Sequence, residues 1–180
     1  MDDARQRLEP LLRPGEQLRW TGRPDPKVRF GAADVFLVPF SLLWAGFAIF
    51  WETMVITGDS SPFFALWGIP FVLLGLYIVF GRFIIKKRRK QNTVYGLTDS
   101  RAIVSTGSRS VQDTPLAGVP VTSNRSRDGR HVSVVFGNSK PAVYQNTGLD
   151  FFTSGQTPAV AFFDVADPDG LGQALDLVRK

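Results

Sequence analysis

Two apolar stretches decide how this chain is organised: VFLVPFSLLWAGFAIFW at residues 35–51 and SSPFFALWGIPFVLLGLYIVFG at residues 60–81. The second has 22 residues without a charge. As a helix rising about 1.5 Å per residue it is roughly 33 Å long, enough to cross a hydrocarbon core of about 30 Å. The first has 17 uncharged residues and reaches that length by extending to Ile56, with Glu52 at the membrane interface. The sequence therefore predicts a transmembrane helical hairpin over residues 34–81, with helices at about 35–57 and 60–81.

Two other interpretations of the apolar stretches fit less well. A buried helix of a soluble protein normally keeps a polar stripe, whereas residues 36–50 are apolar all round. A cleaved signal peptide needs a short basic leader, whereas about thirty mostly polar residues come before the first stretch here. We therefore expect both helices to remain in the mature protein.

Basic residues flank the hairpin on one side of the predicted membrane. Residues 1–33 carry seven basic and five acidic side chains, and residues 82–90 carry six basic and no acidic ones. The loop between the helices has no Lys or Arg, and Glu52 and Asp59 lie in or beside it. Because Lys and Arg are retained on the cytoplasmic side of short flanking segments, we expect a multi-pass protein of the cytoplasmic (inner) membrane with both termini in the cytoplasm.

The basic run after the hairpin supplies candidate contacts for anionic lipid headgroups and anchors for the topology. Each Lys or Arg near an acidic leaflet contributes on the order of 1 kcal/mol to attraction. A nucleic-acid partner is not expected, because no aromatic residues interleave with the run and the chain from residue 91 onward has eight basic and eight acidic residues. The six candidate residues are Arg82, Lys86, Lys87, Arg88, Arg89 and Lys90.

Strand-like segments follow the basic run. Residues 93–98 and 101–105 are rich in β-branched and aromatic residues and flank a turn at Asp99-Ser100. Further along, Asp128-Gly129 comes just before the alternating run 131–136, which is typical of a β-hairpin because Gly readily takes a positive φ. These signals predict an antiparallel β domain.

An amphipathic helix ends the sequence. Asp167 can cap this helix, Pro168 suits its first position, and apolar residues recur at helical spacing over residues 171–178. The expected fold is thus an α+β membrane protein, in which a transmembrane hairpin joins an antiparallel β barrel or sandwich closed by a C-terminal helix. The predicted segments are a cytoplasmic leader with a short helix and strand at 1–33, the hairpin at 34–81, a basic juxtamembrane segment at 82–90 and the β domain at 91–180. The leader either adds to the β domain or lies along the membrane surface.

Two segments carry a family resemblance. The leader contains LRPGEQLRWTGRP at residues 12–24, and the first predicted β-hairpin contains YGLTDSRAIV at residues 95–104. Together with the apolar helices between them, they resemble the bacterial pleckstrin-homology-like membrane proteins. The resemblance implies a small β barrel or sandwich with a C-terminal helix, attached to a transmembrane hairpin and without enzymatic activity. Residues 138–156 look like an insertion and are a candidate for partner specificity, since loops often carry function.

Groups that could support catalysis or bind a metal are few. The chain has no Cys and one His, His131, which begins a strand where a solvent-facing or hairpin-flanking position is expected. General acid–base and nucleophilic mechanisms need a base held by an orienting partner, and the sequence shows no such set. Asp167 and Asp169, which with Asp164 could suggest a cation site, are explained as residues that start a helix. We therefore expect no catalytic residue, no cofactor and no metal site.

Two functional hypotheses remain from the sequence. In the first, the hairpin holds a cytoplasmic pleckstrin-homology-like domain at the bilayer, where it binds an unidentified protein partner or assembles into a homo-oligomer. In the second, the chain is an accessory subunit of a membrane transport or secretion complex and acts through its transmembrane helices. The lipid bilayer is a partner in both.

Overall fold

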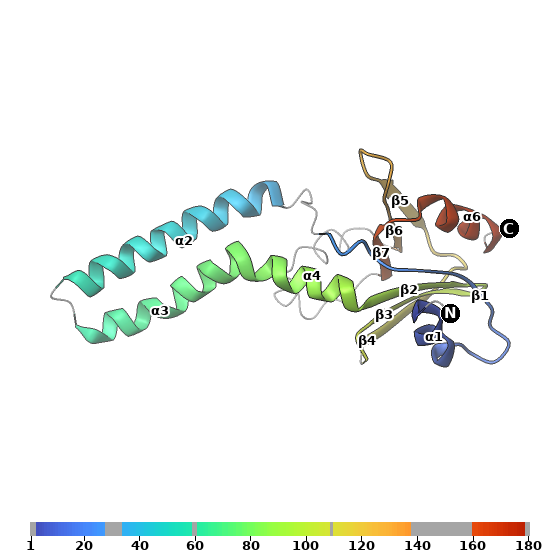
Figure 1. The fold of residues 1–180 in the computed structure, drawn as a ribbon, viewed down its shortest axis with the longest axis horizontal. Helices are drawn as coiled ribbons and strands as arrows, with labels where there is room; N and C mark the ends of the chain where they lie inside the picture. Colours follow the sequence, from blue (N-terminus) through green and yellow to red (C-terminus); the bar gives the residue numbers. More distant parts are fainter. Residues whose placement is uncertain (1–2, 28–33, 59–60, 109, 138–159, 179–180) are drawn as a thin grey trace.

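The computed structural model describes residues 3–27, 34–58, 61–108, 110–137 and 160–178 of the chain. Figure 1 shows a long helical hairpin that projects from a β domain, with both ends of the chain in the β domain. The molecule is α+β, because two long apolar helices are combined with two antiparallel sheets and a C-terminal helix.

The hairpin consists of two antiparallel helical arms. The first is α2 (Asp34–Thr57), and the second runs through α3 (Pro62–Leu76), the π-helical segment η2 (Tyr77–Gly81) and α4 (Arg82–Asn92). The first arm has 24 residues and the second has 31, and both are long and apolar enough to span a membrane. The basic run is therefore helical and continues the second apolar helix directly.

Small side chains bring the two arms together. Gly75 of α3 lies so close to Ala45 of α2 that a Cβ built on Gly75 would be 3.0 Å from the Ala45 Cα. On α2, Ser41 and Ala48 are buried on the same side as Ala45. The large apolar side chains of both arms, by contrast, point away from the helix pair and are exposed. Close packing of small residues is typical of helix pairs in membranes.

Glu52 is buried between the two arms of the hairpin. Its side chain is only 9% exposed, and its Oε2 lies against Gly68, where a Cβ would collide with the carboxylate. Five residues separate Glu52 from the end of α2 at Thr57, a distance of about 8 Å along the helix. The small Gly68 leaves room for the carboxyl inside the helix pair, and the interfacial position of Glu52 stays a prediction.

The leader belongs to the β domain. It forms α1 (Asp3–Leu8), the short 3-10 helix η1 (Glu9–Leu11) and β1 (Leu18–Gly22). Strand β1 pairs antiparallel with β2 (Thr93–Thr98), from Leu18 opposite Thr98 to Gly22 opposite Tyr95. The whole hairpin is therefore inserted between two neighbouring strands of one sheet.

Two sheets make up the rest of the domain. In the first, the order is β1-β2-β3-β4, with β3 at Arg101–Thr106 and β4 at Ser110–Pro115. In the second, the order is β5-β6-β7, with strands at Val121–Arg125, Val132–Phe136 and Val160–Val165. The predicted turns are present: β2 and β3 meet at Asp99-Ser100, and Gly129 takes a φ of 68° between β5 and β6. Helix α6 (Pro168–Val178) follows β7.

Aromatic rings fill the space between the sheets. The Phe162 ring of β7 lies 4.8 Å from the Tyr95 ring, 5.0 Å from the Phe136 ring and 5.9 Å from the Trp20 ring, measured between centroids. Helix α6 adds Leu171 to this core. Because Trp20 comes from β1, the leader supplies part of the core as well as an edge strand.

The described strands do not close into a barrel, so the barrel alternative of the expected fold is wrong. Between β7 and the segment after β1, the described residues form one isolated bridge, Pro24 opposite Val165. Proline has no N–H to donate, which prevents a continuous ladder at this position. At the other edge, the connection from Leu116 to Pro120 turns the chain from one sheet to the other, and Gly118 takes a φ of 72° within it.

Candidate functional site

Helical periodicity divides the six basic residues of α4 into two sets. Arg82, Lys86 and Lys90 recur every four residues on one face and are buried. The other three, Lys87, Arg88 and Arg89, are exposed. The sequence treated all six as headgroup contacts, whereas the structure places half of them inside the protein.

The base of the hairpin is closed by an ion pair. The Arg82 Nη1 lies 2.9 Å from the Asp34 Oδ1, and the two side chains are 1% and 4% exposed. The Lys86 Nζ lies 4.0 Å from the other oxygen of the same carboxylate. Asp34 is the first residue of α2, where a negative charge also complements the helix dipole. These contacts join the start of the first arm to the end of the second.

Lys90 connects the hairpin to the second sheet. Its Nζ lies 2.6 Å from the Asp164 Oδ2 of β7 and donates a hydrogen bond of 3.1 Å to the Lys27 carbonyl oxygen. Asp164 takes a φ of 50°, in the left-handed region that Asp tolerates better than most residues. The result is a junction at which α4, β7 and the segment leading into α2 meet.

The same junction includes the single histidine. The His131 Nε2 lies 2.8 Å from the Asp25 Oδ2, and the Asp25 N–H donates to the Asp164 carbonyl oxygen at 2.8 Å. His131 is buried where it flanks the β5–β6 turn, so of the two positions expected from the sequence the hairpin-flanking one is found and the solvent-facing one is wrong. Its ring is covered because the segment after β1 crosses the start of β6, a contact between distant parts of the chain that no local pattern indicates.

The exposed side of the second arm changes character within one turn. Ile84 and Ile85 are exposed apolar residues, and the exposed cations Lys87, Arg88 and Arg89 follow immediately. An apolar helix that becomes cationic over such a short distance matches the boundary between hydrocarbon and headgroups in a bilayer. This boundary is the feature of the structure best suited to contact a membrane surface.

A second buried ion pair joins the leader to the first sheet. The Arg101 guanidinium donates to both oxygens of Glu16, at 2.8 Å and 2.9 Å, and to the Asp113 Oδ2 at 2.6 Å. Thr98 donates to the same Glu16 carboxylate at 2.7 Å. The Arg101 hydrogen bonds hold the pKa of Glu16 well below its usual range, and the pKa of Arg101 is raised in turn, chiefly by Glu16. The Arg101 guanidinium is therefore paired with acidic residues of the protein itself.

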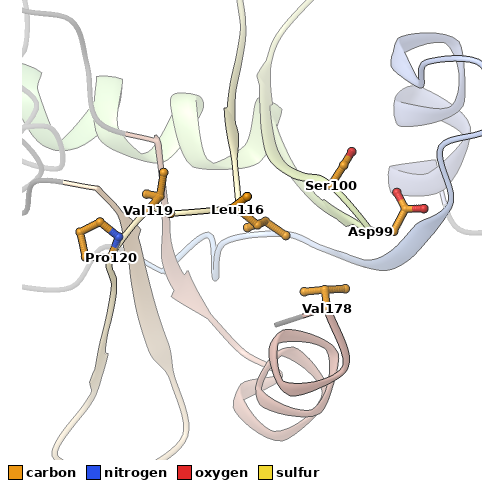
Figure 2. A pocket seen from close by; sticks show the side chains of 8 residues that line it. Asp99, Ser100, Leu116, Val119, Pro120 and Val178 are labelled. Atoms are coloured by element: carbon orange, nitrogen blue, oxygen red, sulfur yellow. The ribbon is translucent and has the colours of Figure 1, made fainter. Parts of the chain in front are cut away.

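A groove of about 830 Å³ opens at the far end of the β domain from α4. Figure 2 shows it between the β2–β3 turn, the connection after β4 and the last turn of α6. Asp99 and Ser100 supply the polar side chains, and Leu116, Val119 and Val178 supply apolar ones. A groove of this size and mixed chemistry can accept a peptide or a loop of another protein.

The hairpin carries a smaller, apolar crevice of about 270 Å³. It lies across both arms, so a ligand or a helix of another protein in this crevice would contact both. Its lining is formed by Trp44, Phe47, Ala48, Trp51, Trp67 and Phe71.

In the part of the chain that the structure describes, no group of three or more His, Asp and Glu side chains is placed to hold a metal ion. Residues 138–156, the candidate for partner specificity, lie outside the described residues. Comparison with protein-family models, curated proteins and solved structures finds no match. The pleckstrin-homology-like resemblance therefore remains a prediction.

Proposed function

We propose that this chain is an integral protein of the cytoplasmic membrane. Its hairpin spans the bilayer and presents the β domain, a pleckstrin-homology-like module, at the cytoplasmic surface, where the domain binds another protein or assembles with itself. The observation that carries the proposal is the exposure of the hairpin's large apolar side chains. The role itself is binding and not catalysis.

The pattern of burial supports a bilayer over water as the surroundings of the hairpin. Of the 18 consecutive residues that are most apolar in the first arm, 22% are buried, and the corresponding share in the second arm is 11%. Val35 and Leu43 of α2 are 79% and 75% exposed. A helix in the core of a soluble protein would bury most of these side chains, and monomeric soluble proteins rarely expose an apolar surface of this extent.

Length and charge support the orientation. The 24 residues of α2 extend about 36 Å, slightly more than a hydrocarbon core of about 30 Å. The Asp34–Arg82 ion pair joins the two arms at the end of the hairpin nearer the β domain, and this places the leader and the β domain on one side of the proposed membrane. The basic residues at this end favour the cytoplasmic side by the positive-inside rule.

Exposed strand edges and the groove support a binding role. Among the described strands, β4 pairs with β3 alone and β5 with β6 alone, and both strands are largely exposed. An unpaired edge can accept an extended segment of another chain through backbone hydrogen bonds. The groove beside Asp99 and Val178 lies at the end of the domain that faces away from the proposed membrane.

Single cysteines test the topology cleanly, because the chain has none of its own. We expect Thr57→Cys, at the tip of the hairpin, to react with a membrane-impermeant maleimide on intact spheroplasts. Leu177→Cys, on α6, should react only after the membrane is opened. Labelling of Leu177→Cys from outside, or extraction of the chain from membranes by alkaline carbonate, would refute the proposed arrangement.

The apolar crevice favours a second candidate function, that of an accessory subunit of a membrane transport or secretion complex acting through its helices. Photo-crosslinking side chains separate the two functions. Capture of a membrane protein from position Trp67, in the crevice, supports the second function. Capture from the exposed Val111 of β4, without capture from Trp67, supports the first.

A further inference from the structure

A second group of cations lies in the turn between β5 and β6. Arg127 and Arg130 are exposed, and neither forms an ion pair with another described residue. Arg125, at the end of β5, is paired with Asp169 of α6 at 3.0 Å. The turn thus presents two guanidinium groups that form no ion pair with another described residue, and the Asp128 carboxylate lies between them in the sequence.

A chain of short contacts connects this turn to α4, at the end of the hairpin next to the β domain. The Ser126 Oγ accepts from the His131 N–H at 3.1 Å, which holds the two ends of the turn together. His131 contacts Asp25 at 2.8 Å, Asp25 bonds to the Asp164 backbone at 2.8 Å, and Asp164 pairs with Lys90 of α4. Figure 1 shows the β5–β6 turn nearer to the hairpin than the C-terminal end of α6 is. Arg125, just before the turn, contacts the start of α6.

The height of this junction above the bilayer follows from helix geometry. Ile85 is the last exposed apolar residue of the second arm, and Lys90 lies five residues later, about 8 Å further along the helix. The headgroup layer on each side of the hydrocarbon is roughly 5–8 Å thick. Lys90 therefore lies at the outer edge of the headgroups, and a turn joined to it is within reach of them.

We propose that the β5–β6 turn is a docking surface for anionic phospholipid headgroups, which Arg127 and Arg130 bind while Lys87 and Arg88 of α4 bind others. This inference rests on the proposed function, because it requires the hairpin to lie in a bilayer. One cationic patch on a helix would leave the tilt of the hairpin and its attached β domain relative to the membrane plane unfixed. A second patch, off the helix axis, fixes which face of the domain lies on the membrane and which face remains open to a partner.

Charge and position favour a lipid surface over a nucleic acid. The turn continues the cationic boundary of α4, and cations near an acidic leaflet are attracted to it. The turn has no aromatic side chain on which a base could stack, a common feature of single-stranded nucleic-acid sites.

A fluorescent reporter beside the turn tests this proposal in the full chain. Asn124→Cys places a bimane label next to the turn, and Leu177→Cys places one on α6 as a distant reference. Each labelled protein is reconstituted into nanodiscs of phosphatidylcholine, with or without about 30% phosphatidylglycerol, that contain lipids with a nitroxide on the headgroup. We expect quenching at Asn124→Cys to increase about two-fold with the anionic lipid and to return to the neutral-lipid level in about 0.5 M salt. Quenching at Leu177→Cys should stay low.

Matched variants assign the effect to the turn. Arg127→Gln with Arg130→Gln should abolish the increase at Asn124→Cys, whereas Arg5→Gln with Arg19→Gln, which removes the same charge elsewhere on the exposed surface, should leave it intact. Equal quenching with and without phosphatidylglycerol, or an increase that survives in the turn variant, overturns the inference. A larger bimane response to single-stranded DNA than to phosphatidylglycerol overturns it in favour of nucleic acid. Failure of the chain to enter nanodiscs defeats the proposed function together with the inference, whereas normal incorporation without quenching defeats the inference alone.

Discussion

Glu16 and Arg101 are 85 residues apart in the sequence and form a bidentate ion pair in the β domain. The side chains are 4% and 9% exposed. Glu16 belongs to the segment LRPGEQLRWTGRP, and Arg101 belongs to YGLTDSRAIV. The two segments that carry the family resemblance therefore contact each other through this ion pair. The pair attaches the leader to the first sheet, which explains why Glu and Arg stand at these two positions.

This ion pair predicts a loss of stability in acid. Arg101 holds the pKa of Glu16 in the folded protein well below its usual range, whereas the unfolded chain has a Glu pKa of about 4.3. The stabilisation from Glu16 is thus fully present above about pH 4.5 and declines as the pH falls toward the folded pKa, by at most about 1.4 kcal/mol per pH unit. Denaturant unfolding of the detergent-solubilised chain between neutral pH and pH 3 measures this slope.

Glu16→Gln supplies the control for the acid effect. It leaves the Arg101 guanidinium without its main partner, so we expect a loss of about 3 kcal/mol at neutral pH and a shallower decline below about pH 4.5. Arg101→Lys should recover only part of the stability of the pair, because a lysine cannot form the two parallel hydrogen bonds. An unchanged acid slope in Glu16→Gln would show that other carboxyl groups dominate.

The hairpin can be removed if it is an insertion between β1 and β2. The Lys90 Nζ contacts the Lys27 carbonyl oxygen at 3.1 Å, so the two ends of the insertion are close enough for a short linker. We expect a chain with residues 28–89 replaced by a short Gly/Ser linker to be soluble and monomeric without detergent. It should unfold in one cooperative transition, because the aromatic core of Trp20, Tyr95 and Phe162 lies entirely outside the insertion. Sedimentation and thermal circular dichroism are the measurements.

A deletion that also removes the leader is the matched comparison. A chain starting at residue 90 lacks β1 and therefore the Trp20 ring and the Glu16 carboxylate. It should aggregate or show no cooperative transition, since removing an aromatic core side chain alone costs about 3–5 kcal/mol. Equal stability of the two shortened chains would mean that β1 is not part of the folding unit.

The organisation of the chain could be predicted from sequence where the signals are local. The hairpin followed from uncharged length, the β2–β3 and β5–β6 turns from Asp-Ser and Asp-Gly, and α6 from its cap and apolar spacing. The sequence did not decide whether β1 joins the β domain or lies along the membrane surface. Pairing between strands 70 residues apart produces no repeating pattern in the sequence that would indicate it. The barrel alternative failed at Pro24, whose missing N–H limits the pairing beside β7.

The candidate site could be predicted only in part, for a similar reason. The basic run was visible, but a charge count does not show which side chains turn inward. The spacing of Arg82, Lys86 and Lys90 at every fourth residue was the available signal, once the run is taken as helical. Their partners Asp34 and Asp164 are single acidic residues in distant segments, so the ion pairs appear only in the folded chain.

Close packing of the two arms predicts opposite results at two glycines. A side chain at Gly75 would press on the Ala45 backbone, whereas a Cβ at Gly46 would meet no atom within 4 Å. We expect Gly75→Leu to separate the arms and to lower the thermal midpoint in detergent by several degrees, in line with the roughly 1–3 kcal/mol cost of overpacking. Gly46→Leu should leave the midpoint unchanged or slightly higher. Equal effects at both positions would contradict the described helix interface.

The Lys90–Asp164 pair predicts a coupling between the hairpin and the second sheet. Asp164→Asn keeps a residue that tolerates the left-handed φ of 50° but removes the charge that faces Lys90, so its cost reports the ion pair and not backbone strain. Because this change leaves a buried ammonium without a carboxylate to balance its charge, we expect a loss of about 3 kcal/mol in unfolding free energy. Lys90→Met should cost a similar amount, and the double variant should cost clearly less than the sum of the two, since each removes the same interaction. Strict additivity in this double-mutant cycle would show that the two side chains do not interact, and the junction between α4 and β7 would then need another explanation.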